Sequence, residues 1–202
     1  MLRSLYVIDT ETTGFPRRSL MCPVRPIQFG AVLLDPESLE ELDAIELLLN
    51  PEVWPPGYAA AEKIHGITRA RAEMVGFSMK SSFRRMLDWI SDHRKKRGGY
   101  GQILAWNASF DHQIMDRWAH GAGSDVYRTD TPPWPDWRRA DLRAPGGCLM
   151  QMWRTYCAGT GSRATSLSAS LKALDMPEQR SPHTALEDAR SAAVVLRAMV
   201  KP

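Results

Sequence analysis

The chain has 202 residues, of which 44% are hydrophobic and 24% charged, and a formal net charge of +3. This composition is typical of a globular domain and excludes a disordered or fibrous chain. Three cysteines argue against a disulfide framework, and no apolar run reaches the roughly 18 residues of a membrane-spanning helix, so we expect a cytoplasmic protein with no membrane partner.

The first fifty residues predict three strands that form an antiparallel meander. Short apolar runs followed by turn signals are typical of buried strands joined by short connections. The runs are residues 5–8, residues 27–34, which end at Asp35-Pro36, and residues 42–49, which end at Asn50-Pro51.

The remaining sequence predicts mainly helices. Apolar side chains recur with helical spacing at positions 83, 86, 87 and 90, and again at 110, 114 and 118. Further helices are expected over 59–64, 149–156, 167–174 and 185–200, with a strand at 103–106 and a long irregular connection over 121–147. We therefore expect one α/β domain over residues 1–202, in which a mixed sheet of meander and parallel strands is flanked by helices.

Two carboxylates follow the first predicted strand. Side chains alternate along a strand, so Asp9 and Glu11 project from the same face. They repel each other unless a cation or a proton lies between them, and oxygen ligands of this kind suit Mg²⁺ or Mn²⁺. A solvated strand end is the alternative interpretation.

Two helix starts supply further polar groups. Thr184 and Glu187 form a capping box, which places Asp188 in the first helical turn and His183 on the loop before it. A histidine on such a loop can reach over a metal site and take a proton from water. Directly after the strand at 103–106, Asn107 is a candidate cap and Asp111 lies in the first turn of the next helix.

Together, these segments resemble the DEDDh (DnaQ-like) family of 3′→5′ exonucleases, which have the ribonuclease H-like fold. The similarity is carried by Asp9-Thr10-Glu11-Thr12-Thr13-Gly14, Asn107-Ala108-Ser109-Phe110-Asp111 and His183-x-Ala185-x-x-Asp188. Pro26-Ile27-Gln28-Phe29-Gly30-Ala31-Val32 and Ile64-His65-Gly66-Ile67-Thr68 add to it. The segments occur in the family's order and cover most of the chain.

The resemblance implies a site with two divalent metal ions, Mg²⁺ or Mn²⁺. The implied ligands are Asp9, Glu11, Asp111 and Asp188, with Asp9 bridging both ions, and His183 is the implied general base. Such an ion pair can activate a water molecule and stabilise the departing 3′ oxygen, which would release nucleoside 5′-monophosphates.

The same resemblance implies contacts with the terminal nucleotide. They fall on the segment Thr12, Thr13 and Gly14, and on His65 and Asn107. The expected partner is the 3′ end of single-stranded nucleic acid, with DNA favoured over RNA. Whether a replication or repair protein is a further partner stays open.

Three other functions stay open. The first is an exoribonuclease that degrades short RNA, because no motif reports a contact with the 2′-hydroxyl. The second is a non-catalytic nucleic-acid-binding subunit, which the presence of all five catalytic residue types disfavours. The third is a small-molecule phosphohydrolase, which the wider resemblance disfavours. The basic run Arg94–Arg97 is either a solvated helix end or a contact for the phosphate backbone.

Overall fold

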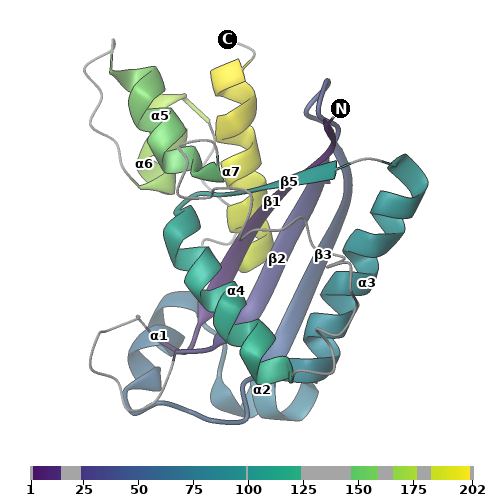
Figure 1. Cartoon of the computed structure of the whole chain (residues 1–202). Helices are drawn as coiled ribbons and strands as arrows, with labels where there is room; N and C mark the ends of the chain where they lie inside the picture. The colour runs from purple at the N-terminus through teal and green to yellow at the C-terminus, as the bar shows by residue number, and fades with distance from the viewer. Residues whose placement is uncertain are drawn as a thin grey trace.

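A computed structural model describes residues 2–14, 24–98, 100–123, 147–158, 166–176 and 183–200. The described residues form five strands and seven helices. The strands make up one sheet, and helices lie on both of its faces (Figure 1). The strands are β1 (Leu2–Thr12), β2 (Pro26–Leu34), β3 (Glu41–Asn50), β4 (Phe77–Ser78) and β5 (Tyr100–Ala105). The helices are α1 (Tyr58–His65), α2 (Arg69–Val75), α3 (Met79–Arg97), α4 (Ala108–Ala122), α5 (Leu149–Cys157), α6 (Leu167–Ala173) and α7 (Ala185–Val200).

The sheet has the order β4-β3-β2-β1-β5. β1, β2 and β3 pair antiparallel, whereas β5 runs parallel to β1 and β4 runs parallel to β3. The predicted meander and the mixed α/β sheet are therefore confirmed. β1 is longer than the apolar run that predicted it, because its polar end from Asp9 to Thr12 continues to pair with β2.

Each face of the sheet carries its own hydrophobic core. Tyr6 and Ile8 of β1 pack towards α3 and α4, whereas Leu5 and Val7 pack towards α5, α6 and α7. In Figure 1, α3 and α4 lie in front of the sheet and α7 lies behind it. This alternation along β1 determines which helix each polar residue at the strand's end faces.

Two short elements escaped prediction. α2 buries only Ala72, so it has no apolar periodicity to reveal it, and it begins where the Thr68 hydroxyl accepts a hydrogen bond from the Arg71 amide. β4 is a two-residue edge strand whose side chains are exposed.

Several expected boundaries differ from the structure; β5, for example, spans Tyr100–Ala105, whereas the sequence predicts a strand over 103–106. α1 ends at His65, one residue beyond the helix expected over 59–64, and His65 is buried. The connection expected over 121–147 begins later, because α4 continues to Ala122; residues 124–146 lie outside the described residues. None of the helices in the described ranges has the length and apolarity needed to cross a membrane.

Candidate active site

The carboxyl end of β1 supplies two acidic side chains. Asp9 and Glu11 are both partly exposed, and their odd positions place them with Val7 on the face that α7 covers. Thr10, between them, faces α4 and is buried. One strand end therefore presents polar groups to helices on both faces of the sheet.

Helix α4 brings a third carboxylate to this strand end. Asp111 lies in its first turn, where the partial positive charge of a helix N-terminus favours an anion, and is only 2% exposed. The Thr10 hydroxyl donates a 2.9 Å hydrogen bond to Asp111 Oδ1 and thereby links β1 to α4.

Asn107 occupies the position before α4, as expected, but its side chain does not cap the helix. Its Oδ1 instead accepts a hydrogen bond of 3.3 Å from the Ser109 hydroxyl, and no side-chain hydrogen bond to the first-turn amides is formed. The expected cap is therefore wrong in its hydrogen bonding, although the helix begins where the sequence predicts. The amide of Asn107 is exposed, so its expected contact with a nucleotide stays a prediction.

Helix α7 brings the fourth carboxylate and the histidine from the opposite face. One ligand atom each of Glu11, His183 and Asp188 lies within 4.8 Å of the other two. His183 is exposed and has a left-handed backbone, with a φ of 66°, immediately before the helix. The Asp188 amide donates to the Thr184 carbonyl, so the first α-helical turn starts at Thr184, as the sequence predicts.

Two residues of β2, whose roles sequence reasoning missed, hold the start of α7. The buried Gln28 accepts a 3.0 Å hydrogen bond from the Ala185 amide and donates one of 3.0 Å to Glu46. Gly30, the β2 partner of Asp9, has no side chain, and a Cβ there would lie 2.2 Å from the Leu186 nitrogen. A glycine inside a strand is a signal of close approach, but it does not reveal which segment approaches.

The clustered carboxylates disfavour one another's ionisation. Burial, and then repulsion from Asp111, Asp188 and Glu11, raise the pKa of Asp9 well above its usual range. Burial and repulsion from Asp188 and Asp111 raise the pKa of Glu11 to about 8. Burial raises the pKa of Asp111 to about 7, although the Thr10 hydrogen bond lowers it. Divalent cations would remove this cost, and carboxylate oxygens are the ligands that Mg²⁺ and Mn²⁺ prefer.

The segment expected to contact the terminal nucleotide lies beside these carboxylates. The Thr12 hydroxyl donates to the Gly14 carbonyl over 2.7 Å. Thr13 is joined to Arg25 twice, through its amide at 2.9 Å and its hydroxyl at 3.0 Å. These hydrogen bonds hold the backbone at the end of β1 in one conformation.

His65 approaches the same place from α1. Its Nδ1 accepts a hydrogen bond from the Ile67 amide, so the proton of the neutral ring is on Nε2, which is buried without a hydrogen-bond partner among the described residues. The pKa of His65 lies below its usual value. Burial is the largest cause, and the neighbouring His183 also lowers the pKa, whereas the Thr12 backbone raises it. The structure therefore brings His65 into the neighbourhood of Thr12 and His183.

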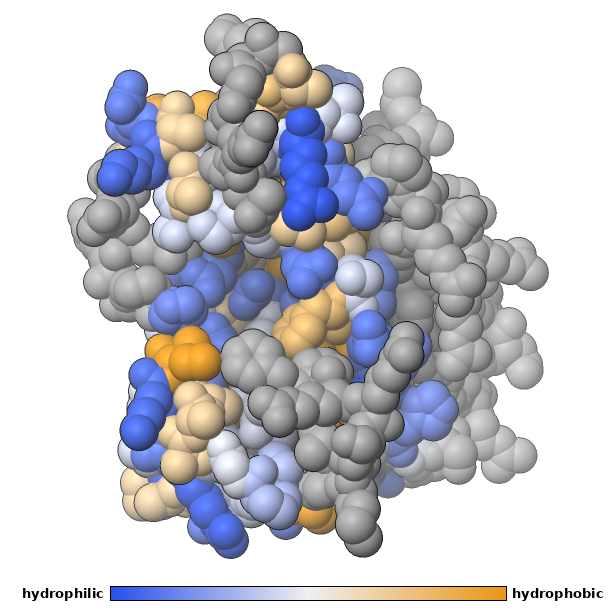
Figure 2. Space-filling view, turned by 90° about the vertical axis from the view of Figure 1, so that its left-hand side faces the viewer, coloured by the Kyte–Doolittle hydropathy of each residue, from blue (hydrophilic) through white to orange (hydrophobic). Residues whose placement is uncertain are grey.

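The left-hand side of Figure 1, where β1 ends and α4 begins, is seen face-on in Figure 2. Near the middle of that face, mostly hydrophilic residues lie in a recess. The basic run at the end of α3 lies elsewhere, because Arg97 precedes the start of β5 and β5 then runs towards α4. The six residues of β5 extend about 20 Å, and this length separates the basic run from the start of α4. Within that run, Arg97 pairs with Asp35 at 2.8 Å.

Comparison with solved structures identifies the fold. The nuclease domain of 3′hExo, described as a DEDDh family member bound to rAMP, superposes with a TM-score of 0.71 at 18% identity, over 99% of this chain and 92% of that one. A full-length 3′-exonuclease gives a TM-score of 0.71 at 17% identity, with 99% of this chain covered. The zinc-bound E. coli ExoI–ssDNA complex gives 0.69 at 20% identity, over the whole of this chain.

The chain spans 61% of the full-length 3′-exonuclease and 42% of E. coli ExoI. No protein-family model matches the sequence, and no curated protein matches it significantly. At these identities the likeness concerns architecture: the chain has the ribonuclease H-like fold of the DEDDh 3′-exonucleases, as the sequence motifs predicted.

Proposed function

We propose that this protein is a metal-dependent 3′→5′ exonuclease that removes nucleoside 5′-monophosphates from single-stranded nucleic acid. The observation that carries the proposal is the meeting of Glu11, His183 and Asp188, whose ligand atoms lie within 4.8 Å of one another beside Asp9. These groups come from the first and last elements of a fold shared with 3′-exonucleases.

The residues present fit a site for divalent cations. Desolvation raises the pKa of Asp9, Glu11 and Asp111, and repulsion from neighbouring carboxylates raises it further at Asp9 and Glu11. Their charged forms are therefore costly, and bound cations would offset that cost. With Asp188, these carboxylates would hold the ions. Bound there, divalent ions would supply positive charge for the reacting phosphate and for the departing 3′ oxygen.

The side chains of this protein would perform the remaining tasks. His183 is exposed and close to two carboxylates, so it would accept the proton of the attacking water at a ring nitrogen. The water oxygen would bond to phosphorus while the bond from phosphorus to the 3′ oxygen breaks. The held backbone of Thr12 and Thr13, which lies next to His65, would position the terminal nucleotide.

The test is digestion of single-stranded DNA and RNA of one sequence, labelled at the 5′ end, with Mg²⁺, Mn²⁺ or EDTA. We expect a ladder that shortens from the 3′ end with either metal and no cleavage in EDTA. Parallel substrates labelled in the 3′-terminal nucleotide should release labelled mononucleotide first. The Asp188→Asn variant should be inactive, and Asp88→Asn, an exposed carboxylate on α3, is the matched control.

The outcome separates this proposal from its alternatives. Cleavage of RNA alone would make the protein an exoribonuclease. Binding of both strands without cleavage under any metal would favour a non-catalytic nucleic-acid-binding subunit. Structures of the same fold include a complex with single-stranded DNA and a 3′-exonuclease described as recognising a histone mRNA stem-loop, so both DNA and RNA belong in the test.

A further inference from the structure

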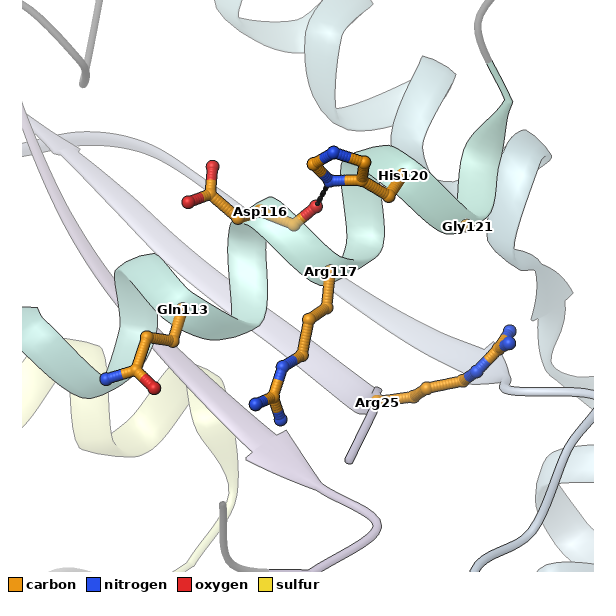
Figure 3. A pocket seen from close by; sticks show the side chains of 6 residues that line it. All are labelled: Arg25, Gln113, Asp116, Arg117, His120 and Gly121. Atoms are coloured by element: carbon orange, nitrogen blue, oxygen red, sulfur yellow. Dashed lines mark hydrogen bonds between the residues drawn. The ribbon is translucent and has the colours of Figure 1, made fainter. Parts of the chain in front are cut away.

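A cleft of about 500 Å³ lies beside the candidate active site and is not part of it. It is open to solvent along the outer side of α4, and Figure 3 shows the side chains around it. Its lining consists of Arg25, Gln113, Asp116, Arg117, His120 and Gly121. Among these residues, only Arg25 and Arg117 have side chains with a permanent positive charge.

Both arginines keep their positive charge available. Arg117 donates a hydrogen bond of 3.3 Å to the Val24 carbonyl, and Arg25 donates one of 3.3 Å to the Pro51 carbonyl. Within the described residues, neither forms an ion pair with a carboxylate. A guanidinium has five N–H donors, so most remain for a ligand. In Figure 3 the Asp116 carboxylate lies on the other side of α4 from the Arg117 guanidinium.

The cleft is joined to the candidate site through two short paths. Arg25 is hydrogen-bonded through its backbone to Thr13, which directly follows β1. Arg117 lies on the same helix as Asp111, six residues further on, which corresponds to about 9 Å along the helix axis. Successive phosphates of a stacked strand are separated by about 3.4 Å along its axis, so 9 Å corresponds to about three nucleotides.

We propose that this cleft binds the phosphodiester backbone of the substrate strand a few nucleotides before its 3′ end, through Arg25 and Arg117. The inference rests on the proposed function and adds a second binding site to it. Arginine matches phosphate because its planar fork donates two parallel hydrogen bonds. Gln113 and His120 add further polar groups at the rim. Contacts to phosphate position a strand without reading its sequence, so the cleft accepts DNA and RNA.

The test compares Arg117→Gln with Arg84→Gln, which removes the same charge from an exposed position on α3. The readout is KM against salt concentration for a twelve-nucleotide DNA, the corresponding RNA, and a dinucleotide too short to reach the cleft. We expect Arg117→Gln to raise KM for both long strands about three- to tenfold and to lower the log–log salt slope by about 0.7, the value of one phosphate contact on a single strand. The kcat value and the dinucleotide kinetics should stay unchanged.

Two further measurements keep the test decisive. Arg117→Lys retains the charge but not the fork, so it should lie between wild type and Arg117→Gln; it also serves if loss of the Val24 contact unfolds the glutamine variant. Fluorescence anisotropy with a labelled twelve-nucleotide strand in EDTA measures binding without cleavage.

A wild-type protein that binds but cleaves nothing contradicts the proposed function and leaves the cleft testable by this binding assay. Identical salt slopes for Arg117→Gln and Arg84→Gln would overturn the inference.

Discussion

The two helices that meet at the end of β1 are held there in different ways. On one face, α4 contributes Asp111, which is 2% exposed and is hydrogen-bonded by Thr10 of the strand. On the other face, α7 contributes the exposed His183 and the partly exposed Asp188. The start of α7 is fixed through its backbone, by Gln28 and by contact with Gly30.

This difference divides the candidate chemistry between the two faces. The α4 side offers a buried carboxylate, which suits a cation that must be held in one place. The α7 side offers an open imidazole beside two carboxylates, which suits proton transfer to and from water. Substitutions and metal ions that act on one face more than on the other test this division.

Asp9→Asn should have the largest effect, because Asp9 interacts electrostatically with carboxylates on both faces. A neutral amide cannot balance divalent charge, so we expect no detectable Mg²⁺-dependent cleavage, while Asp88→Asn should cleave like wild type. In EDTA the variant should melt no lower than wild type, since repulsion is relieved. Substantial cleavage by purified Asp9→Asn protein would falsify the metal-ligand role of Asp9.

His183→Ala should lower kcat by about 10²–10⁴-fold, the usual contribution of a general base. Mg²⁺ binding, measured by calorimetry, should change little, because Mg²⁺ prefers oxygen ligands. A variant with the wild-type kcat would place the base elsewhere.

Gly30→Ala should lower kcat by about 10²-fold, because it displaces the start of α7 and leaves α4 in place. The added Cβ would lie 2.2 Å from the Leu186 nitrogen, so the first turn of α7 must shift, and a shift of about 1 Å at a reacting group can cost that much. We also expect a stability loss of about 1–3 kcal/mol from overpacking. Full activity in a variant with a lowered Tm would show that the contact serves stability and not positioning.

Zn²⁺ should distinguish the two sides by ligand type. Imidazole with carboxylates is a ligand set that Zn²⁺ accepts, so Zn²⁺ should bind at Glu11, His183 and Asp188 and remove the proton acceptor. We expect Zn²⁺ to inhibit Mg²⁺-dependent cleavage, and His183→Ala to weaken Zn²⁺ binding about tenfold or more. Calorimetry with Zn²⁺ on both proteins provides the check; equal affinities would remove His183 from the Zn²⁺ site.

Asp111→Asn should change the pH dependence of stability in the absence of metal. Burial raises the pKa of Asp111 to about 7, so between about pH 4 and 7 the folded protein retains a proton that the unfolded chain has released. The wild type in EDTA should therefore lose stability as the pH rises through this window, on the order of a few kcal/mol. The amide keeps the acceptor for Thr10 and should flatten the dependence; parallel Tm curves from pH 5 to 8 would contradict this.

The features that depend on local pattern could be predicted from the amino-acid sequence. Alternation along β1 placed Asp9 and Glu11 on one face, and helical spacing revealed α3 and α4. The position of Thr184 directly before α7 also followed from nearby residues, because a cap involves atoms within a few positions of one another.

The contacts that bring these parts together are visible only in the folded protein. Gln28 holds the Ala185 amide across 157 residues of sequence, and the space that Gly30 leaves open matters only because α7 crosses it. Topology also decided which basic residues lie near the site: the charged run Arg94–Arg97 is placed at the start of β5, whereas the inconspicuous Arg25 lies beside Thr13. Local pattern encodes periodicity and caps, but close approach between distant segments depends on how both layers pack on the sheet.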